Sequence, residues 1–353
     1  MSFEWLLENA SAPIKYILTK EDKYVPEVLE NFEVKYWLTR LKERSDNKDL
    51  SSIHGSHDYR YENIMGKCAI LGLSQNCAAF DFDKNAKFIL DFLNAHIKNK
   101  NTENEPLSFG KIYSYRDYET ILACFLPELG YQNNPAVRYI AEKRINIAYN
   151  FTKQKRYDIY IDSSKLKGVK KEWHPYIINP ELYYDGNIAL PSVHDYILFS
   201  GIYKYLDKDL QEKVENIVEW LLDEEYRKLK RRYGYFYAEG GAYNTKSILM
   251  TIFFPDIENP GSGSVPELLY IIYILSRFKF SIKSNWFKMA LSYLDDFKTS
   301  YNTYIFPKEM ITEKSDNYVI NGGHMNLGEN KKSKKYYEIL STYWMYRINK
   351  NLD

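Results

Sequence analysis

The sequence predicts an all-α protein, and three observations lead to this prediction. Apolar residues recur at helical spacing in almost every segment that has a pattern, and strand-like alternation is confined to the loops. The helical segments follow one another in pairs joined by short polar turns. With 353 residues, 45% of them apolar and 16% aromatic, the chain is long and apolar enough to bury a large core.

The apolar stripes locate the helices along the chain. The first stripe runs through Val25, Leu29, Phe32 and Tyr36, and Pro26 suits the first turn of a helix there. The remaining stripes pass through Ile64, Cys68 and Leu71; Ile89, Leu93 and His96; Tyr115, Tyr118, Leu122 and Phe125; Leu210, Val214, Ile217 and Leu221; Phe287, Leu291, Leu294 and Phe297; and Tyr336, Ile339, Tyr343 and Tyr346. Together they predict about twelve helices.

Four pairs of these helices predict helical hairpins, over residues 70–97, 129–147, 196–222 and 265–297. Hairpins that cannot bury their apolar faces alone must stack, as an open solenoid of the HEAT type or as a closed ring, the α/α toroid. Long connections rich in Gly, Pro, Asn, Asp and Tyr favour the ring, with loops gathered over one mouth of a central cavity. They cover residues 99–113, 153–191, 232–242, 255–264 and 299–333. We therefore expect one α/α-toroid domain over residues 1–353.

Charge and cysteine content narrow the class of protein. The 48 Lys and Arg residues balance 47 Asp and Glu residues, so the basic excess typical of nucleic-acid binding is missing. Two dense basic runs, 227–232 and 331–335, fit solvated surface, with an anionic headgroup or a diphosphate as the alternative ligand. Three cysteines without metal-ligand spacing fit reduced core thiols.

The N-terminal segment and the apolar runs bear on localisation. Glu4 and Glu8 interrupt the first apolar stretch, which argues against a signal peptide. The longest apolar run, 268–275, is far shorter than the ~20 residues that span a bilayer. These features predict a cytoplasmic protein without a transmembrane segment.

Several segments resemble bacterial squalene-cyclase-like proteins with prenyltransferase-type repeats, of the terpenoid-cyclase α/α-toroid superfamily. The segments that carry the resemblance are Trp5–Tyr16, Tyr61–Lys67, Leu190–Asp195, Gly322–Glu329 and Ser341–Ile348. The resemblance implies the toroid fold and an aromatic central pocket. It does not extend to the Asp-x-Asp-Asp acid motif of class II cyclases, because Asp81-Phe82-Asp83-Lys84 lacks the third carboxylate. The chain would therefore be a divergent branch of that group.

Histidines beside carboxylates are the first candidates for acid–base chemistry. His57 and Asp58 lie just before a predicted helix, and His57 follows His54 by three residues. The segment can provide an acid–base pair, form a solvated loop, or contribute to a metal site. His194 stands beside Asp195 at a predicted helix start, and an imidazole held by a carboxylate can act as a general base. The alternative is that Asp195 caps the helix while His194 packs.

Glycine-paired turns supply the other candidates. His324 follows Gly322-Gly323, and Glu239 precedes Gly240-Gly241, at positions where a tight turn can present a side chain to a ligand. Asp185 lies in the Tyr-rich loop before His194, and Glu329 is a weaker candidate near His324.

We expect an enzyme that acts on a hydrophobic or isoprenoid-like small molecule in an aromatic pocket. The 34 tyrosines contribute core residues on the helices and a set in the loops that would rim such a pocket. Aromatic faces stabilise cationic intermediates, and the acids and bases would be His57, Asp58, Asp185, His194, Glu239 and His324. Two alternative functions remain open. The chain could be a carbohydrate hydrolase or lyase, or it could be a non-catalytic binding or scaffold protein. The sequence indicates no particular cofactor or metal.

Overall fold

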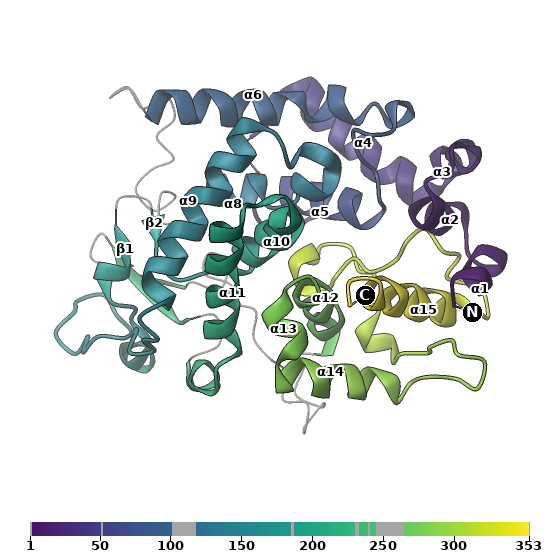
Figure 1. Cartoon of the computed structure of the whole chain (residues 1–353). Coiled ribbons are helices and arrows are strands. Elements are labelled where there is room, and N and C mark those ends of the chain that lie inside the picture. The colour runs from purple at the N-terminus through teal and green to yellow at the C-terminus, as the bar shows by residue number, and fades with distance from the viewer. Residues whose placement is uncertain are drawn as a thin grey trace. The chain divides into compact units, whose positions relative to one another are not determined.

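The computed structural model describes residues 2–50, 52–100, 118–184, 187–229, 233–238, 241–244 and 265–352 (Figure 1). They are mostly helical, which confirms the all-α prediction. The strands of the described residues form two short antiparallel hairpins, and both lie in or beside segments predicted to be loops. Strand β1 (Tyr183–Tyr184) pairs with β2 (Asn187–Ile188), and β3 (Tyr235–Ala238) pairs with β4 (Gly241–Asn244).

The chain divides into two compact units. Unit 1 contains Met1–Asp91, Phe125–Gln132 and Pro255–Asp353, and unit 2 contains Phe92–Cys124 and Asn133–Phe254. The ring arrangement and the single domain over residues 1–353 both stay predictions.

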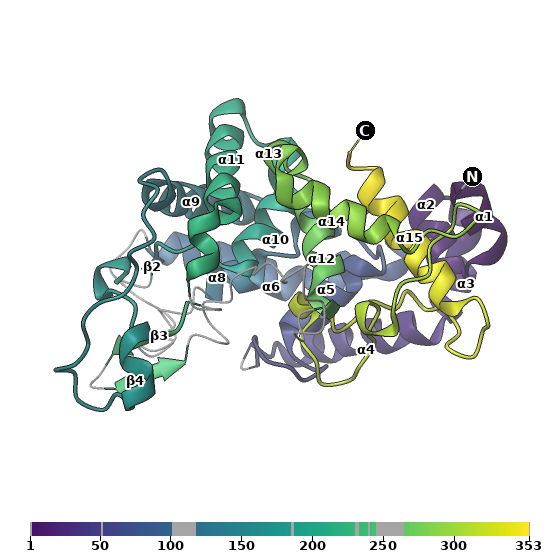
Figure 2. The same ribbon diagram turned by 90° about the horizontal axis from the view of Figure 1, so that it is seen from below.

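Unit 1 is built from helices of both ends of the chain. Its helices are α1 (Ser2–Asn9), α2 (Ala12–Thr19), α3 (Val25–Glu30), α4 (Phe32–Asn47), α5 (Tyr61–Ile70), α12 (Val265–Leu275), α13 (Lys279–Lys283), α14 (Asn285–Asp295) and α15 (Tyr336–Asn349). Short helical turns are η1 (Asp22–Tyr24), η2 (Ala78–Phe80), η3 (Pro127–Tyr131), η9 (Lys308–Met310) and η10 (Val319–Asn321). The last helix, α15, packs on α1 and α12, so the two ends of the chain share one core (Figures 1 and 2).

Unit 2 is centred on the packing of α9 (Pro135–Thr152) against α11 (Lys208–Leu222), which lie beside each other in Figures 1 and 2. Helix α6 (Phe82–Lys100) belongs to unit 1 up to Asp91 and to unit 2 from Phe92 onward. The other helical elements are α8 (Tyr118–Ala123), η4 (Lys171–Tyr176), η5 (Pro180–Leu182), α10 (Val193–Ile202), η6 (Tyr203–Tyr205) and η7 (Glu224–Lys228). The apolar stripe predicted on α11 is buried, as expected.

The single helix predicted through Val25 and Phe32 is wrong, because Asn31 divides it into α3 and α4. Asn31 has an extended backbone, and its Oδ1 accepts hydrogen bonds from the main-chain N–H groups of Glu33 (3.0 Å) and Val34. This cap starts a new helix with a different buried face. The side chain of Phe32 is consequently 80% exposed, and α4 buries Val34, Trp37 and Leu41 instead.

The predicted long connection at 299–333 is a packed part of unit 1. Its apolar side chains are buried, among them Met310, Val319, Met325 and Leu327. Elements η9 and η10 both contact α12, and η10 also contacts α5. This segment therefore contributes to the core, and its polar residues are held in fixed positions against the helices.

The cysteines and the length of the apolar helices were also predicted from the sequence. All three cysteines are buried and none of them forms a disulfide, as predicted for core thiols. Among the described residues, none of the helices has the length and apolar character that crossing a membrane requires.

Candidate functional site

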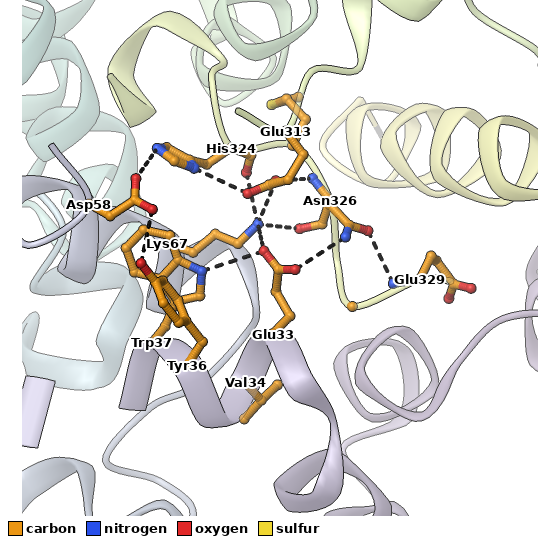
Figure 3. Close-up of polar contacts among 12 residues, drawn as sticks. Glu33, Val34, Tyr36, Trp37, Asp58, Lys67, Glu313, His324, Asn326 and Glu329 are labelled. Atoms are coloured by element: carbon orange, nitrogen blue, oxygen red, sulfur yellow. Dashed lines mark hydrogen bonds and ion pairs between the residues drawn. The ribbon is translucent and has the colours of Figure 1, made fainter. Parts of the chain in front are cut away.

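Lys67 is the centre of a polar cluster buried in unit 1 (Figure 3). Its side chain has no exposed surface, and its Nζ lies 2.8 Å from Glu313 Oε2 and 3.1 Å from Glu33 Oε1. The same ammonium group donates to the main-chain carbonyls of Asn326 (2.6 Å) and His324 (3.4 Å). Two carboxylates and two carbonyls thus satisfy an ammonium group that would be costly to bury alone.

Local backbone pairing brings Glu313 and His324 together. The two residues form an antiparallel bridge, extended by a hydrogen bond from Met325 N to Thr312 O (2.8 Å). Residues paired in this way direct their side chains to the same face. Glu313 Oε1 accordingly lies 3.1 Å from His324 Nδ1, while its other oxygen accepts from Lys67 and from Asn326 N (2.8 Å).

Burial and neighbouring charges have opposite effects on the pKa values of Glu313 and Lys67. Burial alone would raise the pKa of Glu313, but the charge of Lys67 and then the hydrogen bond from His324 outweigh it and lower the pKa to about 2. Burial alone would lower the pKa of Lys67, but the charges of Glu313 and Glu33 outweigh it and raise the pKa. The ionised forms are therefore favoured.

His324 connects the buried cluster to Asp58. Its ring nitrogens face two acceptors, Glu313 Oε1 and, from Nε2 at 2.8 Å, the carbonyl of Asn317. With Glu313 ionised, both acceptors are satisfied only when each nitrogen carries a proton. Asp58 Oδ1 lies 3.8 Å from Nε2, and the ring of Trp37 packs edge-on against the imidazole at 5.2 Å between centroids.

Asp58 is the most accessible carboxylate in contact with His324. Its side chain is 13% exposed; its Oδ2 accepts from the Tyr36 hydroxyl (3.1 Å) and its Oδ1 from Asp316 N (2.9 Å). Desolvation raises the pKa of Tyr36; a hydrogen bond with Arg40 opposes this, and the charge of Asp58 adds to it. Asp58 therefore stands between the buried imidazole and a phenol near the surface.

His57 lies on the outer side of the same region. Its ring is 49% exposed, with Nδ1 2.8 Å from Asp316 Oδ1. It stacks on Tyr59 with 5.3 Å between ring centroids and 8° between ring planes. Tyr59 is itself 44% exposed, and Asp316, the partner of His57, also donates its main-chain N–H to Asp58.

Asn326 and Glu329 extend the cluster toward the N-terminal helices. Asn326 Nδ2 donates to Glu33 Oε2 (3.3 Å), and its Oδ1 accepts from Glu329 N (3.1 Å). Glu329 in turn accepts from Ser11 N at 2.6 Å. Burial raises the pKa of Glu329, and the Ser11 hydrogen bond opposes this. This side of the cluster serves mainly to hold the 322–329 segment in place.

Of the six predicted site residues, three are brought together in unit 1, one lies in unit 2, and two cannot be placed. His57, Asp58 and His324 share one region of unit 1, although they are far apart in the sequence. His194 is buried at the start of α10 in unit 2. Asp185 and Glu239 lie outside the described residues.

Asp195, the neighbour of His194, has a structural role in unit 2. It forms a capping box with Ser192, and both of its oxygens lie 2.9 Å from the guanidinium of Arg144, which is also buried. The helix cap that the sequence offered for Asp195 is confirmed, and the role of His194 as a general base stays a prediction.

Sequence reasoning missed Lys67, Glu33, Glu313 and Tyr36. For Lys67 a signal existed, because it is the one charged residue between positions 63 and 80, in the middle of an apolar helix. Such a residue must be either exposed or paired in the core. The loop residue Glu313 carries no comparable signal, since its position depends on the bridge to His324.

Comparisons with known proteins leave the site to be interpreted from its own chemistry: no protein-family model matches the chain, and neither a curated protein nor a solved structure is significantly similar to it.

Proposed function

We propose that this chain is an acid–base enzyme in which Asp58 acts as the general base. The observation that carries the proposal is the position of Asp58: a partly accessible carboxylate with the buried His324 imidazole on one side and the Tyr36 hydroxyl on the other. Behind His324, the ion pair of Glu313 with Lys67 fixes the imidazole in orientation. Catalytic bases are commonly held by such a chain of hydrogen bonds.

The proton transfers follow from this arrangement. Asp58 takes a proton from the substrate, whose bonding electron pair stays on the substrate. The imidazole of His324 stabilises the carboxylate before this transfer. The Tyr36 hydroxyl donates to Asp58 at that stage, and it turns to the developing negative charge of the substrate once Asp58 holds the proton. Return of the proton from Asp58 to a different substrate atom, or to a leaving group, completes an isomerisation or an elimination.

The proposed substrate is a hydrophobic or isoprenoid-like small molecule. Aromatic side chains contact Asp58 and its neighbours: the Tyr36 hydroxyl donates to Asp58, Trp37 packs on His324, and Tyr59 stacks on His57. Rings of this kind bind apolar surface and stabilise positive charge. We also propose that the helical hairpins close into an α/α toroid, as the sequence resemblance implies.

A test uses a substrate panel and a matched pair of variants. The purified chain is incubated with farnesyl diphosphate, geranylgeranyl diphosphate, squalene and a set of aryl glycosides, and products are identified by mass spectrometry. Asp58→Asn keeps the size of the side chain and should lower turnover by about 10²-fold or more. Lys334→Gln, which changes an exposed charge, is the control.

The outcomes separate the proposed classes. Turnover of an isoprenoid that is lost in Asp58→Asn, with an unchanged melting temperature, supports the proposal. Cleavage of a glycoside would instead favour a carbohydrate enzyme. Full activity of Asp58→Asn on any substrate would refute the role of Asp58, and a loss of stability without loss of activity would identify the cluster as a structural anchor.

A further inference from the structure

Asn63 is a buried polar residue of unit 1 that takes no part in the proposed proton transfers. It lies in the first turn of α5 and is fully buried. Its Nδ2 donates to the main-chain carbonyls of Gly55 (3.0 Å) and His57 (3.1 Å), and its Oδ1 accepts from Val319 N (2.9 Å). An amide has two N–H donors, so each carbonyl receives a proton of its own. Burying an amide is favourable only when such bonds are made, and these bonds therefore fix its orientation.

The three hydrogen bonds join two segments that are far apart in the sequence. Gly55 and His57 belong to the loop that carries Asp58. Val319 begins η10, in the segment that carries His324, and η10 packs on α5. One buried side chain thus holds the loop of the proposed base and the segment of the imidazole at a fixed separation.

The contacts of Asp58 depend on that separation. Its Oδ1 accepts from Asp316 N at 2.9 Å and lies 3.8 Å from His324 Nε2 (Figure 3). Asp58 directly follows His57, whose carbonyl is bound by Asn63. A displacement of this carbonyl would therefore move the carboxylate away from both of its partners, and a shift of about 1 Å is enough to impair a catalytic group.

The ends of the same loop are held by another side chain. Arg44 is buried, and its guanidinium donates to the main-chain carbonyls of Asp49 (2.8 Å), Ser52 (3.0 Å) and Tyr59 (2.6 Å). These bonds do not involve Asn63. We therefore expect the loop to stay folded when Asn63 is replaced, while its middle part moves.

We propose that Asn63 is a positioning residue that sets the place of Asp58 relative to His324. It acts through the main chain at Gly55 and His57, and it rests on the proposed function in that Asp58 is taken as the base. The geometry requires an amide at this position. An ionised aspartate has the same shape, but it would present oxygen atoms to two carbonyl oxygens and could donate to neither.

Hydrogen exchange of the intact chain, followed by NMR spectroscopy, tests the proposal with Asn63→Asp. The ionised carboxylate keeps an acceptor for Val319 N and loses both donors to the loop. We expect the protection of the Asp316 amide, which is bound by Asp58, to fall about tenfold or more. The amide of Ser276, which donates to a carbonyl of α12, should keep its protection.

Ser284→Ala is the matched control. The Ser284 hydroxyl caps α14 by accepting from Phe287 N (3.2 Å), so its removal destabilises unit 1 without changing a bond of the Asp58 loop. This control should not lower the protection of the Asp316 amide relative to that of Ser276.

The wild type provides a second measurement, which needs no variant. Both side-chain amide protons of Asn63 are hydrogen-bonded, so they should exchange slowly. If Asn63 holds the loop, these protons and the Asp316 amide become accessible in the same local opening, and their protection factors should agree within about threefold. Rapid exchange of the Asn63 side chain beside a protected Asp316 amide would overturn the proposal.

Turnover gives a readout of the chemistry. With an isoprenoid substrate that the wild type converts, Asn63→Asp should lower kcat about tenfold or more and leave KM nearly unchanged, because Asn63 acts through Asp58. Absence of turnover in the wild type would refute the proposed function alone, since the exchange measurements decide on Asn63 independently.

Two results with Asn63→Asp would also overturn the proposal. One is unchanged protection of the Asp316 amide. The other is an equal loss at Asp316 and Ser276, which would assign to Asn63 a role in general stability. If this variant does not fold, the wild-type measurement decides the question.

Discussion

Replacing Lys67 with methionine should remove the charge that holds the central cluster of unit 1 together. Methionine keeps most of the side-chain volume, so the change isolates the ammonium group. Glu313 and Glu33, which are only 10% and 14% exposed, would then stay buried without their cation. Breaking a buried ion pair in this way costs about 3–5 kcal/mol.

The pKa of Glu313 gives an independent measure of the same interaction. Its fall from an ordinary 4.5 to about 2 corresponds to roughly 3 kcal/mol of stability at neutral pH, to which His324 also contributes. Because the folded-state pKa is the lower one, this stability is complete above about pH 4.5 and is lost as the pH falls toward 2. In Lys67→Met the loss should begin at a higher pH.

Urea unfolding followed by circular dichroism, repeated from neutral to acid pH, measures both effects. Lys334→Met serves as the control, since it removes an exposed lysine and should change the free energy of unfolding by less than about 0.5 kcal/mol. The double variant Lys67→Met/Glu313→Gln should recover part of the loss. The reasoning would be refuted if Lys67→Met changed the free energy of unfolding by less than about 1 kcal/mol and left its dependence on acid pH unaltered.

Three further predictions concern separate parts of the chain. Asp195→Asn should destabilise unit 2 by about 3 kcal/mol or more in urea unfolding, because Arg144 loses its buried partner; a loss below about 1 kcal/mol would contradict this. Gly66→Ala should lower the urea midpoint by an amount equivalent to about 1–3 kcal/mol, because its Cβ would meet two side chains at 2.7 Å, and an unchanged midpoint would show that they move freely. Lys20→Gln should raise the melting temperature at neutral pH, where the charged lysine is disfavoured in the folded state. That gain should vanish as the pH rises from about 8 past 10.5, and a lower melting temperature at neutral pH would argue for an unrecognised anionic partner.

The sequence was informative where a residue's role depends on its near neighbours. The stripe on α11 and the cap at Asp195 follow from spacings of three and four residues, which a helix converts directly into one face or one turn. The stripe through Phe32 failed for a related reason. Apolar spacing alone does not show a helix break, and here the capping side chain of Asn31 separates two helices.

The candidate site could be predicted only in part. His57 and Asp58 were recognised from their local pairing, and His324 from its glycine turn. Their meeting depends on contacts between segments more than 250 residues apart, such as the hydrogen bond from Asp316 N to Asp58. Loop closure over such distances leaves no periodic trace in the sequence, so Glu313 and Tyr36 could not be identified.

The sequence by itself determined that this protein is mostly helical and that its thiols are buried, because these properties depend on composition and short-range spacing. Only the tertiary structure decided which charges are buried. It placed Lys67 between two carboxylates from distant segments, and it placed Arg144 against Asp195. The energy of a charge in a protein depends on the atoms that replace its water, and those atoms are assigned by the fold.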